Sequence, residues 1–312
     1  MPSRPRGLPV AAALACLGLV TALAGCGAGA ADVPPGTVSV VAAFYPLQFA
    51  AEQVGGSHVH VTNLTRPGAE PHDLELSPMD VARVSRAQVV VYEKGLQSAV
   101  DQAVDQEAGD RALDVTGPAH LDLRYTPIEG GQASTVEAGS IDPHFWLDPT
   151  RYALVARAIA DRLGRVDPAH RTAYEANAAH FAGRLESLDH ELATGLAHCQ
   201  RQELVTSHNA FGYLARRYHL QQVGITGLSP DAEPEPASLA RVATYARSHG
   251  VTTIFAEALA SPAIAGTVAR ETGARVAVLD PVEGLTSSSA GRDYVEVMRS
   301  NLAALRTGLG CA

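Results

Sequence analysis

Short apolar runs rich in β-branched residues alternate along the chain with stretches of helical spacing. In the first half these runs cover residues 38–44, 58–64, 89–92 and 112–115, and segments such as SPMDVARVSRAQ separate them. The same pattern recurs after residue 200, with runs at 203–206, 222–225, 252–255 and 275–279. Strands that alternate with helices predict βαβ units and a parallel sheet. We therefore predict an α/β protein of two similar lobes, each a parallel sheet flanked by helices.

The clearest helix signal lies between the two halves. Asp167 is a favourable N-cap and Pro168 suits a first helical position. Apolar residues then recur at helical spacing, which gives one long stripe: Tyr174, Phe181, Leu185, Leu188, Leu192 and Leu196. About 30 residues at ~1.5 Å each would span roughly 45 Å, enough to run along both lobes. We predict a rigid linking helix at 167–198 between lobes at 37–166 and 199–312, because the β-rich flanks argue against a coiled coil.

The N-terminal segment carries the pattern of a secretory signal. Arg4 and Arg6 precede an apolar run over residues 8–23, and the run ends in Leu-Ala-Gly-Cys at residues 23–26. This ending resembles the bacterial lipobox, in which a peptidase cuts before a cysteine that then carries lipid. The prediction is a signal peptide at 1–25, lipid on Cys26, a tether at 26–36 and an extracytoplasmic protein anchored to a bacterial membrane. An ordinary signal peptide with an incidental Cys26 is the alternative.

Charge removes one class of partner. The segment 1–25 holds two of the 24 basic residues and none of the 33 acidic residues, so its removal leaves a formal charge of −11. Such an acidic chain is not expected to bind nucleic acid.

The cysteines favour one disulfide. Cys16 leaves with the signal peptide and Cys26 is assigned to lipid, so Cys199 and Cys311 remain. In an oxidising compartment two remaining thiols favour a bond with each other. Two unpaired thiols are the alternative, and a zinc site built on them lacks partners at suitable spacing.

Four segments each present a side chain that binds metals. These are His72 in PGAEPHDLELSP, His144 in IDPHFWLDP, His208 in LVTSHNAFGY and Asp280 in VAVLDPVEGL. Three imidazoles and one carboxylate form a closed tetrahedral site of the kind that suits zinc. All four lie in loops, where α/β folds place their ligands, and Trp146 could roof a dry site. The other histidines are expected to be exposed or core residues.

These segments resemble the zinc- and manganese-binding lipoproteins that serve as substrate-binding proteins of ABC transporters. The opening VAAFYPLQFAAEQVGG and the motifs PHDLELSPMD, DPHFWLDP, TSHNAFGYLARRY, EPEPASLARV and ETGARVAVLDP match the family in order. The resemblance implies metal held in a cleft between two lobes by His72, His144, His208 and Asp280. It also implies transfer to a membrane permease by a protein expected to be a monomer. Members that prefer manganese commonly carry a carboxylate at the position of His208, so Zn(II) is the expected cargo and Mn(II) the alternative.

One segment departs from that family. Many zinc-binding members carry a His-rich loop before the second ligand motif, whereas IEGGQASTVEAGS at 128–140 has no histidine. Metal capture by this loop, or transfer from a metallochaperone, is therefore in doubt.

Two other function classes compete with transport. A secreted zinc hydrolase would use an open zinc position and a base such as Glu70 or Glu257, but Asp280 would fill that position. Glu257 is expected instead to brace a metal ligand without binding the metal itself. A surface adhesin would be compatible with lipid anchoring but gives no reason for the ligand set. We therefore expect a receptor and no enzyme.

Overall fold

The computed structural model describes residues 33–127, 138–230, 234–259 and 261–312. Residues 33–312 form one compact unit. The predicted signal peptide, Cys26 and most of the segment 128–140 lie outside the described residues. Within the part of the chain that is described, no helix is both long enough and apolar enough to cross a membrane.

The first lobe is a parallel four-stranded sheet in the order β2-β1-β3-β4. In the central strand, Val40 pairs with Val61 on one side and with Val89 on the other. The helix α2 begins with a capping box, in which the side chains of Ser77 and Asp80 each accept from the other residue's backbone N–H. The elements are β1 (Val38–Ala42), α1 (Tyr45–Gly55), β2 (Val59–Asn63), α2 (Pro78–Arg86), β3 (Val89–Tyr92), α3 (Ser98–Ala103) and β4 (Ala112–Asp114).

The second lobe repeats this topology, with a parallel sheet in the order β6-β5-β7-β8. Each sheet therefore has its first two strands exchanged in the same way, and the prediction of two similar parallel lobes is confirmed. The elements are β5 (Glu203–Thr206), α6 (Gly212–Arg217), β6 (Gln221–Gly224), α7 (Pro236–Ser248), β7 (Thr253–Ala256), α8 (Ala263–Thr272), β8 (Arg275–Val278) and α9 (Tyr294–Leu309).

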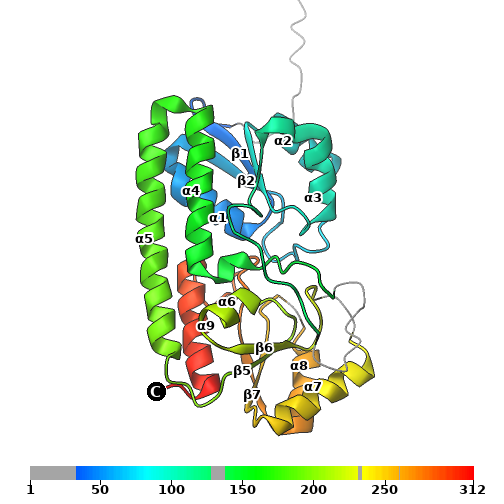
Figure 1. Cartoon of the computed structure of the whole chain (residues 1–312). Coiled ribbons are helices and arrows are strands. Elements are labelled where there is room, and N and C mark those ends of the chain that lie inside the picture. The colour runs from blue at the N-terminus through cyan, green and yellow to red at the C-terminus, as the bar shows by residue number, and fades with distance from the viewer. Residues whose placement is uncertain (1–32, 128–137, 231–233, 260) are drawn as a thin grey trace, which may run out of the picture. The chain divides into compact units, whose positions relative to one another are not determined.

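The helices α4 (Pro149–Val166) and α5 (Arg171–Leu196) form a hairpin, in which α4 lies beside the first lobe and the longer α5 runs along both lobes (Figure 1). The helix α5 packs against α1 of the first lobe and α9 of the second. Its buried side chains are the predicted stripe together with Ala178. At ~1.5 Å per residue its 26 residues span about 39 Å, so the predicted linking helix is confirmed.

The start of α5 differs from the prediction in detail. Residues Pro168–His170 form a 3₁₀ turn, η5, and the α-helix begins at Arg171. The carboxylate of Asp167 does not cap the helix. Instead its Oδ2 lies 2.6 Å from His170 Nδ1 and accepts from Tyr174 Oη at 2.8 Å. These two side chains compete for the oxygen that would otherwise accept from the first backbone N–H groups. Other short helical turns are η1 (Gly56–His58), η2 (Val104–Ala108), η3 (Gly109–Arg111) and η4 (Phe145–Leu147).

The largest hydrophobic core joins the two lobes. One cluster of buried side chains extends from β1 and α1 through α4 and α5 to α9. Aromatic rings lie at its centre, where Tyr152 and Tyr294 have ring centroids 4.8 Å apart and Phe181 packs edge-on against Tyr152. Because the hairpin shares one core with both lobes, the loops at the facing ends of the two sheets are held in place.

The structure contains the predicted disulfide between Cys199 and Cys311. It joins the short segment after α5, three residues past Leu196, to the C-terminal segment after α9, two residues past Leu309, across 112 positions of sequence. Arg201 and Ala312 extend the junction, because their backbone N–H groups donate to Leu309 and His198 respectively.

Replacing both Cys199 and Cys311 with serine is expected to destabilise the fold by about 2–5 kcal/mol, since the crosslink restricts a long loop in the unfolded chain. Denaturant unfolding of the double variant measures this loss. Reduction of the wild-type protein should reproduce it. A variant as stable as the oxidised wild-type protein would contradict the prediction.

Candidate metal centre

His72 lies in the loop after β2, and buried polar contacts fix its backbone. Gln97 donates from Nε2 to the carbonyl of Pro71 at 3.0 Å and to Oγ1 of Thr65 at 3.1 Å. The N–H of His72 donates to Glu70 Oε1 at 3.1 Å. These contacts position the imidazole, whose side chain is only 9% exposed. Glu70, which could act as a base in a hydrolase, thus accepts a hydrogen bond from the backbone of the same loop.

His144 is fully buried at the start of η4, in the segment DPHFW. Asp142 Oδ1 accepts from the backbone N–H of His144 at 2.9 Å and lies 2.8 Å from its Nδ1. Burial alone would lower the pKa of His144, but the carboxylates of Asp142 and Glu283 outweigh burial and raise it above 6.5. Asp142 thus fixes both the backbone and the ring orientation.

Trp146 packs directly against this histidine. Its ring centroid lies 5.3 Å from that of His144 and 5.0 Å from that of Phe44. The indole Nε1 donates to the carbonyl of Pro281 at 2.7 Å. Trp146 is fully buried, so it covers one side of the His144 ring and ties the first lobe to the turn that follows β8.

His208 follows the end of β5 and is held by Glu257, which follows the end of β7. Glu257 Oε1 accepts from the backbone N–H of His208 at 2.9 Å, and Oε2 lies 2.7 Å from its Nδ1. Burial opposes the charged imidazole, but Glu257 and Glu283 raise the pKa of His208 well above 6.5. The second lobe therefore repeats the carboxylate–imidazole pairing seen in the first.

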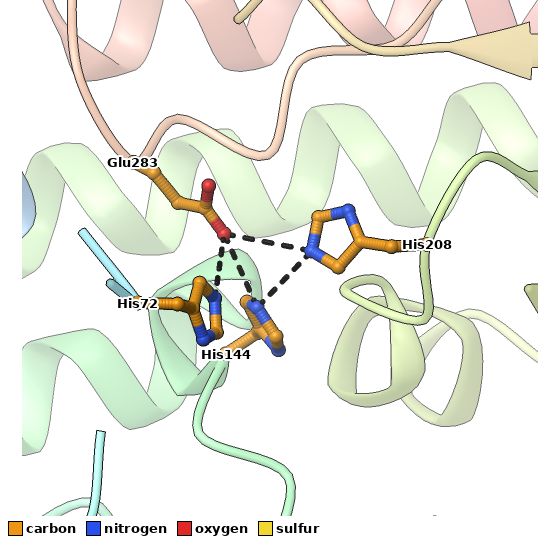
Figure 2. A group of neighbouring side chains, drawn as sticks. All are labelled: His72, His144, His208 and Glu283. Atoms are coloured by element: carbon orange, nitrogen blue, oxygen red, sulfur yellow. Dashed lines mark hydrogen bonds and ion pairs between the residues drawn. The ribbon is translucent and has the colours of Figure 1, made fainter. Parts of the chain in front are cut away.

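The three imidazoles converge on Glu283 (Figure 2). Oε1 of Glu283 lies 3.5 Å from His72 Nε2, 3.2 Å from His144 Nε2 and 3.6 Å from His208 Nε2. The Nε2 atoms of His144 and His208 are 3.4 Å apart. Donors that bind zinc tetrahedrally at about 2.0–2.1 Å lie about 3.3–3.4 Å from one another. Among the described residues these four form the one cluster of three or more histidine, cysteine, aspartate or glutamate side chains whose ligand atoms lie close enough to share a metal ion.

The protonation pattern also suits a cation. A proton on Nδ1 of His144 and of His208 faces a carboxylate, which leaves each Nε2 lone pair directed at Glu283. Burial would raise the pKa of Glu283, but the three histidines hold it well below 4.5. His72 Nε2 and both carboxylate oxygens of Glu283 are buried without a hydrogen-bond partner in the described structure. A divalent cation at their centre would satisfy all of them.

Asp280, the carboxylate predicted as a ligand, has a different place. Its Oδ1 accepts from the N–H of Val282 at 2.8 Å. Its backbone N–H donates to Asn301 Oδ1 at 2.9 Å, and its carbonyl accepts from Asn301 Nδ2 at 2.6 Å. Val282, between Asp280 and Glu283, is fully buried with φ of 59°, a costly conformation for a β-branched residue. This tight turn reverses the chain after Asp280. It places Glu283, three residues further on, among the three histidines. Asp280 is not in the converging group.

The sequence predicts the first carboxylate of this segment, Asp280, as the ligand, whereas the second, Glu283, lies among the three histidines. In parallel sheets the residues just after a strand are the usual candidates for binding a ligand, and Asp280 is the first acidic residue after β8. The local signal for Glu283 is Asp-Pro-Val-Glu itself, because an aspartate that accepts from the second following N–H makes a turn. The sequence did not predict the roles of Gln97 and Asp142. Gln97 holds the loop of His72 from 26 residues away, and Asp142 orients the ring of His144.

We expect Asp142→Asn and Glu257→Gln each to weaken zinc binding by roughly 10–100-fold, because each carboxylate orients an imidazole. Competition titration against a chelator measures the change. Asp105→Asn, which removes an exposed charge from the first lobe, is the control. Equal affinity in all three variants would show that neither carboxylate supports a ligand.

Two parallel sheets whose loops bring three histidines and a glutamate together define a two-lobed, metal-binding α/β protein. The chain belongs to the ZnuA family, described as zinc-uptake complex component A, periplasmic, which matches residues 40–308. The resemblance seen in the sequence is therefore confirmed.

Individual relatives agree with this assignment. The chain is 34% identical over 292 residues to the high-affinity zinc uptake system protein ZnuA of Bacillus subtilis, covering 90% of each chain. It is 37% identical over 279 residues to the zinc-binding lipoprotein AdcA of Streptococcus pneumoniae, covering 87% of this chain but only 56% of that relative. The Zn(II)-bound ZnuA-like domain of S. pneumoniae AdcA superposes with a TM-score of 0.72 at 36% identity, over 88% of this chain and 99% of that domain.

Proposed function

We propose that the chain is the extracytoplasmic receptor of an ABC importer, which binds Zn(II) and delivers it to a membrane permease. The observation that carries this proposal is the convergence of three imidazole Nε2 atoms on one carboxylate oxygen at zinc-like spacing. Family membership supports transport as the role of that site. AdcA extends well beyond the matched part, so the proposal concerns only the part that the two proteins share.

Zinc is proposed as the cargo and manganese as the alternative. Three imidazoles favour zinc, whereas manganese prefers carboxylate and water oxygens. Elemental analysis of protein purified without added metal, followed by calorimetric competition between Zn(II) and Mn(II), tests the choice. One zinc per chain with tighter zinc binding is expected. Tighter manganese binding would overturn the metal assignment, and binding that survives the joint His72→Ala, His144→Ala and His208→Ala change would overturn the site.

Glu283 is proposed as the fourth ligand. Its oxygen lies within 3.6 Å of all three Nε2 atoms, whereas Asp280 Oδ1 accepts from a backbone N–H. Asp280 as the ligand, the expectation from sequence, stays a prediction that the same variants test. In either case the set is closed, with four protein donors.

The closed set supports a receptor without hydrolytic activity. The family is a metal-binding component of transport, and a catalytic zinc keeps a position for water that four protein ligands do not leave. Zinc-loaded protein should hydrolyse esters, amides and phosphoesters no faster than buffer. Zinc-dependent turnover lost in Glu257→Gln or Glu70→Gln, with metal still bound, would favour the hydrolase.

Attachment to the membrane is proposed to depend on Cys26. The lipobox-like sequence at residues 23–26 supports this, as does the description of AdcA as a lipoprotein. Cys26→Ser should release the protein from the membrane or leave it unprocessed, with the mature domain still able to bind zinc. A correctly processed variant that still needs detergent for extraction would show that another segment is the anchor.

The lobes at 37–166 and 199–312, with the helix between them, act as one monomeric unit that docks on the permease. Light scattering of the mature protein tests the monomer. A metallochaperone is a second proposed source of metal for the site, and faster transfer from such a protein than from free zinc would support this route.

A further inference from the structure

Glu93 is a buried carboxyl group that the proposed zinc site does not use. It follows the end of β3 and is 2% exposed. Neither of its oxygens has a hydrogen-bond partner in the described structure. A buried carboxyl group without a donor is costly, so its presence requires an explanation.

Glu93 lines a cavity that also reaches a proposed zinc ligand. This cavity has a volume of about 430 Å³ and is lined by Glu93, Lys94, Leu121, Ser140 and Ser229 together with His72. His72 is the one proposed histidine ligand whose side chain keeps some exposure, 9% against 0% for His144 and His208. One wall of the cavity is therefore also an edge of the metal cluster.

The charges near Glu93 favour a cation. Burial, and after it the negative charges of Asp142, Asp114 and Asp101, raise the pKa of Glu93 well above 4.5. Lys94 also lines the cavity, but it is an exposed residue, so solvent screens its charge. A divalent ion inside would supply the positive charge that the buried carboxyl group lacks.

We propose that Glu93 is a relay ligand, which holds a partly hydrated divalent cation in this cavity on its way to and from His72. The proposal rests on the proposed zinc site and deepens it. Both free oxygens of Glu93 can bind the ion, and water fills its other positions. The ion then exchanges this oxygen and its waters for His72, and subsequently for the other three donors. Release follows the same path in reverse.

A relay ligand changes the rates of binding without changing the affinity, because it lies on the route and not at either end. Glu93→Gln is expected to slow both zinc association and zinc dissociation by about tenfold, because a neutral amide is a weaker ligand for the ion in transit than a carboxylate that ionises on binding it. The zinc Kd should remain as in the wild-type protein. Gln preserves the shape of the side chain and removes an unpaired buried carboxyl group, so the variant should fold.

The chain carries its own reporter for this experiment. Trp146 is the one tryptophan of the sequence and lies 5.3 Å from the ring of His144. Stopped-flow fluorescence with Zn(II) alone gives the association rate, and mixing zinc-loaded protein with excess EDTA gives the release rate. Asp105→Asn, which removes an exposed charge of the same lobe, is the control for net charge and should behave as wild type.

A second variant tests the route itself. Ser229→Phe adds bulk to the lining of the cavity at a residue that is neither Glu93 nor a proposed ligand, and it should also slow both rates. Unchanged rates in Glu93→Gln, or in Ser229→Phe if the first variant does not fold, would overturn the proposal. A weaker Kd in Glu93→Gln through faster release alone would also overturn it, because Glu93 would then hold the bound ion. Absence of zinc binding by the wild-type protein would instead refute the proposed function.

Discussion

Replacing Glu283 with alanine is expected to weaken zinc binding by roughly 100-fold or more, the largest effect of any single carboxylate variant. Structural zinc sites bind with about 10–16 kcal/mol, so an equal share for each of four donors is about 3 kcal/mol. The loss also leaves three imidazoles without the negative charge that faces them at 3.2–3.6 Å. Competition titration against chelators of graded affinity covers the required range.

Asp280→Asn is the matched control, because it removes a carboxylate from the same turn while keeping an oxygen that can accept from Val282. Its affinity should stay close to that of the wild-type protein. If Asp280→Asn loses more affinity than Glu283→Ala, the turn after β8 must rearrange when metal binds, and Asp280 is then the fourth ligand.

The comparison of these two residues shows what the sequence could and could not predict. Strand runs, the apolar stripe of α5 and the three histidines are local signals, since each depends on neighbours within a few residues. Their prediction needed no knowledge of distant contacts. The choice between Asp280 and Glu283 depends on a backbone turn with Val282 at φ of 59°, a conformation that residue preferences disfavour.

Support from outside the ligand segments was harder to predict. Asp142 and Glu257 orient imidazoles. The place of Glu257 after a strand predicts that it braces a ligand, but its partner His208 lies 49 residues away, so the sequence does not identify which ligand it holds. Gln97 holds the His72 loop from 26 residues away, through the carbonyl of Pro71. Glu93 has no partner at all among the described side chains. Such roles emerge only when packing brings strand ends together.

Zinc is expected to raise the melting temperature by roughly 10 °C at about a thousandfold excess over Kd. A ligand that binds only the folded state then adds about 4 kcal/mol, and each kcal/mol shifts a domain of this size by about 2–4 °C. Chelation should leave a folded protein, because a core that joins both lobes is buried without any contribution from metal. Calorimetric scans of zinc-loaded and chelated protein measure the difference. An unfolded metal-free protein would contradict this.

That difference should widen as pH rises from about 5.5 to about 8. His144 and His208 have pKa values raised above 6.5 in the folded metal-free site, so their charged forms stabilise that state below pH 6.5. This contribution disappears as pH rises through the raised values. Glu283, whose pKa is lowered well below 4.5, stabilises the folded protein at every pH above 4.5, and this contribution is lost only in stronger acid.

Protons therefore compete with zinc already above pH 6.5, and more than one proton should be taken up for each zinc released. A difference in melting temperature that does not change with pH would show that zinc displaces no protons and that these imidazoles do not bind it.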